Sequence, residues 1–259
     1  MTLILTQINK YGIIHASDSK LTANDGTQAG QAKKTFALDF LMSGLTLAGT
    51  YSVGGVETDK WMPAFIQDQE NKKVSSLMDF AHALQRQIET DMLPAEKASG
   101  SMIHMAGYVE KSGEFHPEFW FLRNIHSIDS KTGEYGDIDD RFELTEDFWS
   151  RDCPQQNLMD SFQQGGYQIY VNGFASGRIG FVSLQPILNS FFSSIWRNPS
   201  LKFRAPKSID ETVILVKTYM EIINTLFLLS DYSAPLIGGD IQTYIIHQPS
   251  NTATSCKAL

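Results

Sequence analysis

A threonine close to the start of the chain is the first residue whose chemistry stands out. Thr2 follows Met1, and a small side chain in this position is the context in which an initiator methionine is normally trimmed. An N-terminal threonine can hydrolyse an amide without a second catalytic residue. Its hydroxyl is the nucleophile, and its own α-amine, with a reference pKa of about 8, is the adjacent base. We therefore expect Thr2 to be the catalytic nucleophile once Met1 is removed.

Such a nucleophile needs charged and hydrogen-bonding groups beside it. A buried lysine would favour loss of the hydroxyl proton, and a carboxylate would keep that lysine charged and oriented. Asp18 and Lys34 are the candidates, at the end of the second predicted strand and the start of the third. Gly49, at the end of the fourth predicted strand, permits the close approach that a backbone N–H needs to stabilise an oxyanion. Taken singly, Asp18 could cap a turn, and Lys34 could be a solvated neighbour of Lys33.

The strands that must position these residues can be predicted from periodicity and turn chemistry. Short apolar runs bounded by turn residues are typical of strands, and two such runs flank a turn at residues 9–12. A small-residue turn is expected at residues 172–177. Strands are expected at residues 3–8, 13–17, 35–38, 45–48, 102–108, 115–122, 167–171 and 241–247.

Two capping boxes predict where helices begin. Ser76 with Asp79, and Ser208 with Glu211, each place a hydroxyl three residues before a carboxylate and ahead of apolar residues at helical spacing. Helices are expected from 76 to Pro94, from 208 to 229, and, interrupted or begun at Pro186, up to Trp196.

These elements predict one domain over residues 1–248. An acidic, turn-rich insertion is expected at about 127–147, and a polar tail at 249–259. Strands and helices in this order favour an α+β fold with helical layers covering packed sheets. The helix expected at 208–229 is apolar on more than one face, so it is either buried on several sides or covered by a neighbouring subunit.

Residues 2–18 resemble, without a gap, the start of mature proteasome β-subunits and of the peptidase subunit of the bacterial ATP-dependent protease. In that family a threonine opens the chain, and a Gly-aliphatic-aliphatic-x-Ala-x-Asp segment follows, which matches residues 12–18 here. The family's catalytic lysine begins a short strand, which matches residues 34–38. Its oxyanion glycine matches Gly49 if one residue is inserted upstream. The resemblance covers roughly residues 2–55 and is weaker beyond them.

The resemblance implies a four-layer αββα sandwich of the proteasome-like N-terminal nucleophile (Ntn) hydrolase type. It implies a threonine-type peptidase, acting on peptides or unfolded proteins, whose copies assemble into a ring or another oligomer that confines the site. An ATPase unfoldase is a partner that the resemblance also suggests.

The resemblance also suggests two supporting residues. Ser176 matches the serine of the family's Gly-Ser-Gly turn, and Asp231 matches a later aspartate. Ser176 could equally be a turn residue, and Asp231 an exposed residue at a helix end. In the family, the aspartate that matches Asp231 usually begins an Asp-x-x-Ser-Gly-Gly motif. This chain has Ile237 before its two glycines, so the supporting serine is displaced or absent.

Composition excludes several classes of partner. Lys plus Arg number 21 against 29 for Asp plus Glu, a net charge of −8, whereas nucleic acid and anionic membranes both require a basic face. The histidines show no metal-ligand spacing, so we expect neither a metal nor a cofactor. Two cysteines do not make a disulfide framework. Without a signal peptide or a bilayer-length apolar stretch, the sequence favours a cytoplasmic protein.

Two other functions stay open. A non-catalytic structural subunit could retain the same fold, and the altered 231–239 region favours this alternative. A small-molecule amidase or acylase could also use the fold, because a fold does not determine the substrate.

Overall fold

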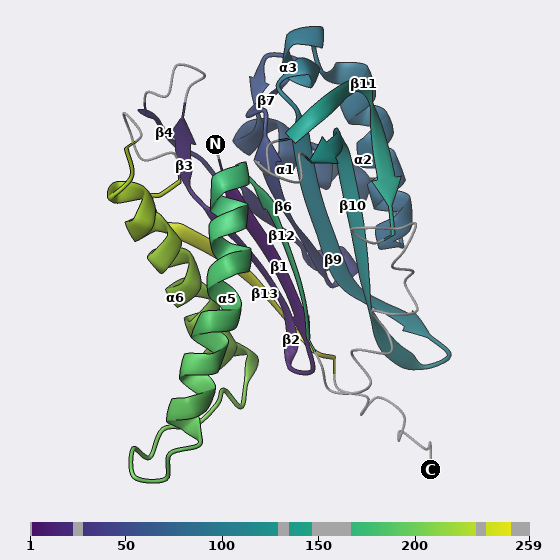
Figure 1. The fold of residues 1–259 in the computed structure, drawn as a ribbon. Coiled ribbons are helices and arrows are strands. Elements are labelled where there is room, and N and C mark those ends of the chain that lie inside the picture. The colour runs from purple at the N-terminus through teal and green to yellow at the C-terminus, as the bar shows by residue number, and fades with distance from the viewer. Residues whose placement is uncertain (1, 23–27, 129–134, 147–166, 232–236, 250–259) are drawn as a thin grey trace, which may run out of the picture.

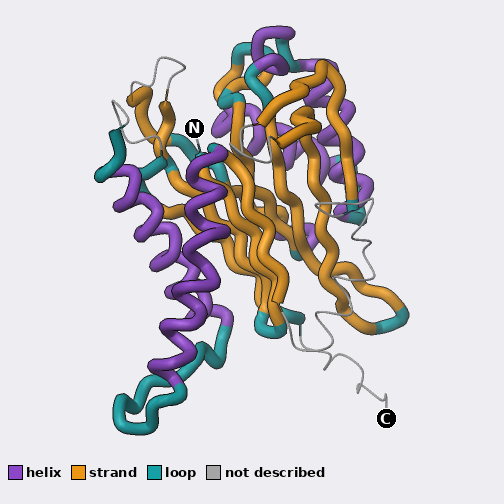
Figure 2. Tube along the Cα trace, viewed as in Figure 1, coloured by secondary structure: helices purple, strands orange, loops and turns teal. Residues whose placement is uncertain are grey.

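A computed structural model describes residues 2–22, 28–128, 135–146, 167–231 and 237–249 of the 259-residue chain. Strands form the centre of the described fold (Figure 2), and the strand pairs within it, such as β1 (Leu3–Asn9) with β2 (Gly12–Asp18) and β9 (Ser101–Lys111) with β10 (Glu114–Ile128), are antiparallel. One large sheet has four strands, in the spatial order β12 (Tyr167–Gly173), β1, β2 and β13 (Ile241–His247).

A second large sheet has five strands and is built mostly from the middle of the chain. Two small hairpins accompany the large sheets: β3 (Lys20–Thr22) with β4 (Gln28–Gln31), and β7 (Ser52–Val53) with β8 (Val56–Glu57). The 3₁₀ turn η1 (Asp39–Leu41) connects β5 to β6. The order in the five-stranded sheet is β11 (Tyr135–Thr145), β10, β9, β6 (Ser43–Gly49) and β5 (Thr35–Leu38).

Helices pack on both large sheets (Figure 1). The helices α5 (Ala175–Trp196) and α6 (Ile209–Leu228) pack on the four-stranded sheet through a buried apolar cluster that includes Phe181 and Met220. The helices α1 (Thr58–Asn71) and α2 (Leu77–Asp91) pack on the five-stranded sheet around Phe80. The short helix α3 (Pro94–Ala98) follows α2 and leads into β9.

Strand β1 is buried along its whole length, on both of its faces. Leu3 and Leu5 belong to the cluster beneath α5 and α6. Ile4 and Ile8 point to the opposite face and pack in a second cluster with Phe119 of the five-stranded sheet. Successive side chains of a strand point to opposite faces, so one strand contributes to both clusters.

A buried polar network joins the two large sheets between these apolar clusters. The Thr6 hydroxyl lies 3.1 Å from His15 Nδ1 and 3.2 Å from His104 Nδ1. His15 Nε2 lies 3.2 Å from the Ala106 carbonyl oxygen, and His104 Nε2 lies 2.8 Å from Asn172 Oδ1. Burial lowers the pKa of His15 to about 4 and that of His104 to about 3, so both imidazoles are neutral at neutral pH.

The predicted four-layer αββα sandwich of the Ntn-hydrolase type is wrong as a description of this fold. The described residues form four antiparallel sheets, of four, five, two and two strands, rather than the two sheets that the prediction requires. The extra strands lie in segments where no strand was predicted, namely 20–22, 28–31, 52–57 and 135–145. The fold is therefore a mostly antiparallel β-architecture of several sheets that carries helices.

Several local predictions are confirmed. The Ser76 hydroxyl accepts a hydrogen bond from the Asp79 N–H at the start of α2, and the Ser208 hydroxyl accepts one from the Glu211 N–H at the start of α6. The strand predicted at 35–38 has the bounds of β5, and that predicted at 241–247 has the bounds of β13.

Other local predictions differ from the structure. The turn expected at 172–177 is wrong, because α5 begins at Ala175 and runs through Pro186 to Trp196. Proline has no N–H to donate to the carbonyl of Val182, four residues earlier. Both residues are exposed, so water can solvate that carbonyl. The acidic insertion expected at 127–147 instead contains β11, which pairs with β10 at the edge of the five-stranded sheet. Most of the expected polar tail lies outside the described residues.

Candidate active site

Thr2 lines a cavity of about 650 Å³ at the end of β1. The residue is only 5% exposed, so the cavity holds it away from bulk solvent. The other lining residues belong to three parts of the chain. The first is β3 together with Lys34, the second is the end of β6 and the residues just after it, and the third is α3 and the residue after it. These lining residues are Leu21, Thr22, Lys34, Leu47, Ala48, Gly49, Thr50, Tyr51, Ser52, Ala95, Glu96 and Ser99.

Asp18 and Lys34 form a buried ion pair beside this cavity. Lys34 Nζ lies 3.5 Å from Asp18 Oδ2 and donates a hydrogen bond of 2.5 Å to the Lys20 carbonyl oxygen. Asp18 Oδ1 accepts a hydrogen bond of 2.8 Å from the Leu3 N–H. The carboxylate therefore connects the lysine to the residue that follows Thr2.

The two adjacent lysines lie in different environments. Lys34 is 1% exposed and lines the cavity, whereas Lys33 is exposed and its ammonium lies 5.1 Å from the centroid of the Phe36 ring. Lys34 is therefore the lysine that the fold places in the cavity with Thr2, and Lys33 provides a natural control for it.

The ion pair is set in an environment that disfavours charge. Burial lowers the pKa of the Lys34 ammonium, and the nearby charge of Asp18 opposes this shift only in part. Burial likewise raises the pKa of the Asp18 carboxyl, against the charge of Lys34 and the hydrogen bonds from the N–H groups of Leu3 and Gly238. A lysine with a lowered pKa takes part in proton transfer near neutral pH more readily than a surface lysine.

Two glycines allow close backbone contacts around Thr2. Gly49 has a φ of 107°, and a Cβ there would lie 2.2 Å from the carbonyl oxygen of Gly100. Gly173, the last residue of β12, has a φ of 113°, and a Cβ there would lie 1.9 Å from the carbonyl oxygen of Thr2. A larger residue at either position would displace the backbone next to the cavity. The sequence singled out Gly49 but not Gly173.

Gln242 of β13 holds the backbone around Lys34. Its Oε1 accepts hydrogen bonds from the N–H of Lys34 at 2.8 Å and of Thr35 at 3.3 Å. Its Nε2 donates to the carbonyl oxygen of Ala32 at 2.5 Å. Sequence reasoning missed this residue because 208 positions separate it from Lys34, and no local pattern marks a glutamine as a clamp.

Replacing Gln242 with leucine is expected to lower the free energy of unfolding by about 1–3 kcal/mol, because buried backbone groups beside Lys34 lose their partner. Urea denaturation measures this loss. The matched control is Gln248→Leu, at an exposed position just after the same strand. Equal stability of the two variants would show that Gln242 does not hold this segment.

Glu96 forms part of the cavity wall and organises the turn between β7 and β8. Its carboxylate accepts hydrogen bonds from the N–H groups of Gly54 at 2.8 Å, Gly55 at 2.9 Å and Leu93 at 2.8 Å. Burial raises the pKa of this carboxyl, but hydrogen bonds from Ser52 and from these N–H groups outweigh the effect and leave the pKa below its usual value. Glu96 therefore acts as an ionised structural group that joins α3 to the β7–β8 hairpin.

The two supporting residues suggested by the resemblance lie at the beginning of α5 and just after α6. Ser176 lies in the first turn of α5, and Asp231 is an exposed residue just after α6. Ile237, at the position where a serine was expected, is fully buried in the apolar cluster with α5 and α6. Thr2, Lys34 and Gly49 therefore meet at one cavity, with Asp18 bonded beside it, and the later part of the chain contributes Gly173, Gly238 and Gln242 instead.

Comparison with known proteins adds no family to this geometry. Neither protein-family models nor curated proteins give a match to the chain. In the part of the chain that the structure describes, no helix has both the length and the apolar character needed to cross a membrane.

Proposed function

We propose that this chain is a threonine-type N-terminal nucleophile amide hydrolase, and that its substrates are peptides. The observation that carries the proposal is the shared cavity of Thr2, Lys34 and Gly49, with Asp18 bonded both to Lys34 and to the N–H after Thr2. A nucleophile, a lysine of lowered pKa and a glycine backbone that admits close approach are the groups that acyl transfer requires.

In this proposal each group has one role. The Thr2 hydroxyl attacks the amide carbonyl, and its proton passes to the free α-amine of Thr2, directly or through water. Lys34 stabilises the negative charge that develops near the hydroxyl, and Asp18 holds Lys34 and the chain next to Thr2 in place. The Gly49 N–H stabilises the oxyanion. The amine of the product leaves, and water then hydrolyses the ester on Thr2.

The mechanism requires that Met1 be removed, because a peptide bond at Thr2 would consume the amine that serves as the base. The resemblance of residues 2–55 to proteasome subunits supports three further proposals. They are assembly of copies into a ring or another oligomer, service to an ATPase unfoldase, and a cytoplasmic location.

One observation favours a second candidate function, a non-catalytic subunit. Ile237 is buried among apolar side chains where the resembling family has a supporting serine next to its two glycines. A site without that hydroxyl could keep its architecture and lose its activity. The small-molecule amidase stays an alternative substrate class, which simple acylated amines would reveal.

Intact-protein mass spectrometry before and after treatment with a β-lactone or epoxyketone probe tests the proposal. We expect a chain that lacks Met1 and carries one adduct, which peptide mapping assigns to Thr2, and no adduct in Thr2→Ala. A processed chain that forms no adduct would favour the non-catalytic subunit. Retention of Met1 in the expressed protein would contradict the catalytic proposal.

A further inference from the structure

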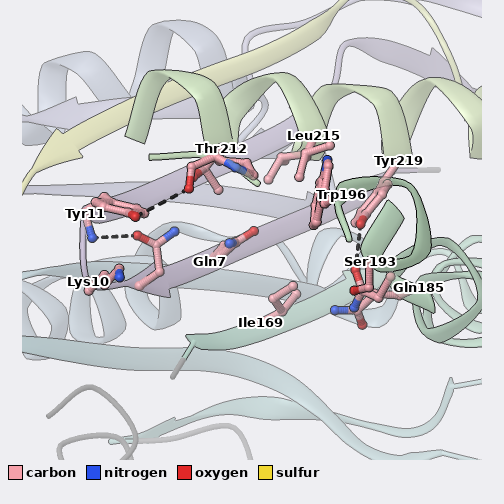
Figure 3. A pocket seen from close by; sticks show the side chains of 14 residues that line it. Gln7, Lys10, Tyr11, Ile169, Gln185, Ser193, Trp196, Thr212, Leu215 and Tyr219 are labelled. Carbon is pink, nitrogen blue, oxygen red and sulfur yellow. Dashed lines mark hydrogen bonds between the residues drawn. The ribbon is translucent and has the colours of Figure 1, made fainter. Parts of the chain in front are cut away.

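A second cavity lies at the opposite end of β1 from Thr2, between the four-stranded sheet and the helices α5 and α6 (Figure 3). Its volume is about 310 Å³, at the lower end of the range for small-molecule sites. Of the residues that the structure describes, none lines both this cavity and the cavity of Thr2. Gln7 lies five positions after Thr2 along the extended chain, which is a distance of about 17 Å.

Gln7 is the central polar group of this second cavity. Its side chain points to the helix-covered face of β1, as those of Leu3 and Leu5 do, and lies between the Lys10–Tyr11 end and the Ser193–Trp196 end (Figure 3). Gln7 is 9% exposed, yet its carboxamide makes no hydrogen bond to any residue that the structure describes. The carboxamide opens into the cavity, where solvent reaches it, so its donor and its acceptor are both available to a ligand.

The surroundings of Gln7 define what such a ligand must be. Aromatic and aliphatic side chains, including Trp196, Tyr219, Leu215 and Ile169, form most of the wall. Among the described residues that line the cavity, Lys10 is the single charged one; it is exposed, and its ammonium lies 5.0 Å from the centroid of the Tyr11 ring. Apolar walls with uncharged polar groups, Gln7 among them, favour a neutral and partly apolar molecule over an anion or a cation.

The chemistry of the carboxamide narrows this class further. A glutamine presents a donor N–H and an acceptor oxygen side by side, and so pairs with a ring that carries an acceptor and a donor on one edge. Proteins recognise unpaired bases by hydrogen bonds to such an edge together with aromatic contact. We propose that this cavity binds an uncharged heteroaromatic ring with an amide-type edge, the chemistry of a free nucleobase or nucleoside.

Isothermal titration calorimetry with uridine and adenosine tests the proposal, with indole as a flat aromatic that lacks the amide edge. Saturable binding of a nucleoside, and weaker binding of indole, is expected. Gln7→Leu should weaken nucleoside binding by about 10-fold or more through the loss of two hydrogen bonds. Leu215→Trp, at a half-buried wall position, should abolish it by filling the cavity.

Two controls separate this site from the rest of the molecule. Gln67→Leu changes an exposed glutamine on α1 and should bind as the wild type does. Thr2→Ala should also bind as the wild type does, so failure of the amide-hydrolase proposal would leave this result unchanged. The proposal is overturned if neither nucleoside binds the folded protein, if indole binds as tightly, or if Gln7→Leu and Leu215→Trp bind like the wild type.

Discussion

Lys34→Met is expected to slow the reaction of Thr2 with a β-lactone probe by about 100-fold to 10,000-fold, the range typical of a positioned acid–base group. Methionine fills a similar volume but carries no charge, so nothing stabilises the developing alkoxide of Thr2. Lys33→Met is the matched control, because Lys33 is exposed and only its neighbour reaches the cavity. The measurement is the rate of adduct formation by mass spectrometry, at equal protein and probe concentrations.

A loss of folding could imitate this result, since Lys34→Met leaves the Asp18 carboxylate buried without its partner. The double variant Lys34→Met with Asp18→Asn removes both charges and should recover much of the stability in urea denaturation. It should remain as slow as the single variant in probe labelling. Labelling of a folded Lys34→Met protein at the wild-type rate would exclude Lys34 from the chemistry.

Acid is expected to destabilise the fold steeply, because His15 and His104 are held neutral. Their folded pKa values of about 4 and about 3 lie below the unfolded value of 6.5. The unfolded chain therefore binds more protons below pH 6.5, and stability rises with pH from about 4 to 6.5 and is independent of these groups above 6.5. Each histidine contributes about 1.4 kcal/mol per pH unit in this window, and the pair roughly twice that.

Urea denaturation at several pH values between 4.5 and 7.5 (roughly the window in which unfolded histidines titrate) measures this slope. His104→Gln should reduce the slope by about 1.4 kcal/mol per pH unit, because one buried base is removed. His82→Gln, on the exposed face of α2, should leave it unchanged. A wild-type slope that His104→Gln does not alter would show that the acid sensitivity arises elsewhere.

Local signals in the sequence were sufficient for the first part of the candidate site. Thr2, Asp18, Lys34 and Gly49 all lie within the first fifty positions, where short strands and tight turns constrain their relative placement. The strand that begins at Thr35 and the two capping boxes could be predicted for the same reason, since each depends on neighbouring residues. Interactions of that kind leave a pattern that can be read along the chain.

The rest depended on distant pairing. Gln242 and Gly173 reach Lys34 and Thr2 only because β13 and β12 flank β2 and β1 in the four-stranded sheet. β11 was taken for a loop because its exposed acidic residues are those that suit the solvated edge of a sheet. The number of sheets could not be predicted, since short hairpins such as β7–β8 carry little periodicity.

The contacts of Thr6 with two imidazoles leave the buried network one proton short. His15 Nε2 faces a carbonyl oxygen and His104 Nε2 faces the oxygen of Asn172, so each ring carries its proton on Nε2 and leaves Nδ1 bare. Thr6 has a single hydroxyl proton for these two bare nitrogens. A proton added to one Nδ1 would complete the hydrogen bonds of this network. A second would leave the Thr6 hydroxyl proton without a partner in the network, because the Thr6 oxygen would then accept from both rings. The two histidines therefore titrate as one unit that accepts a first proton far more readily than a second.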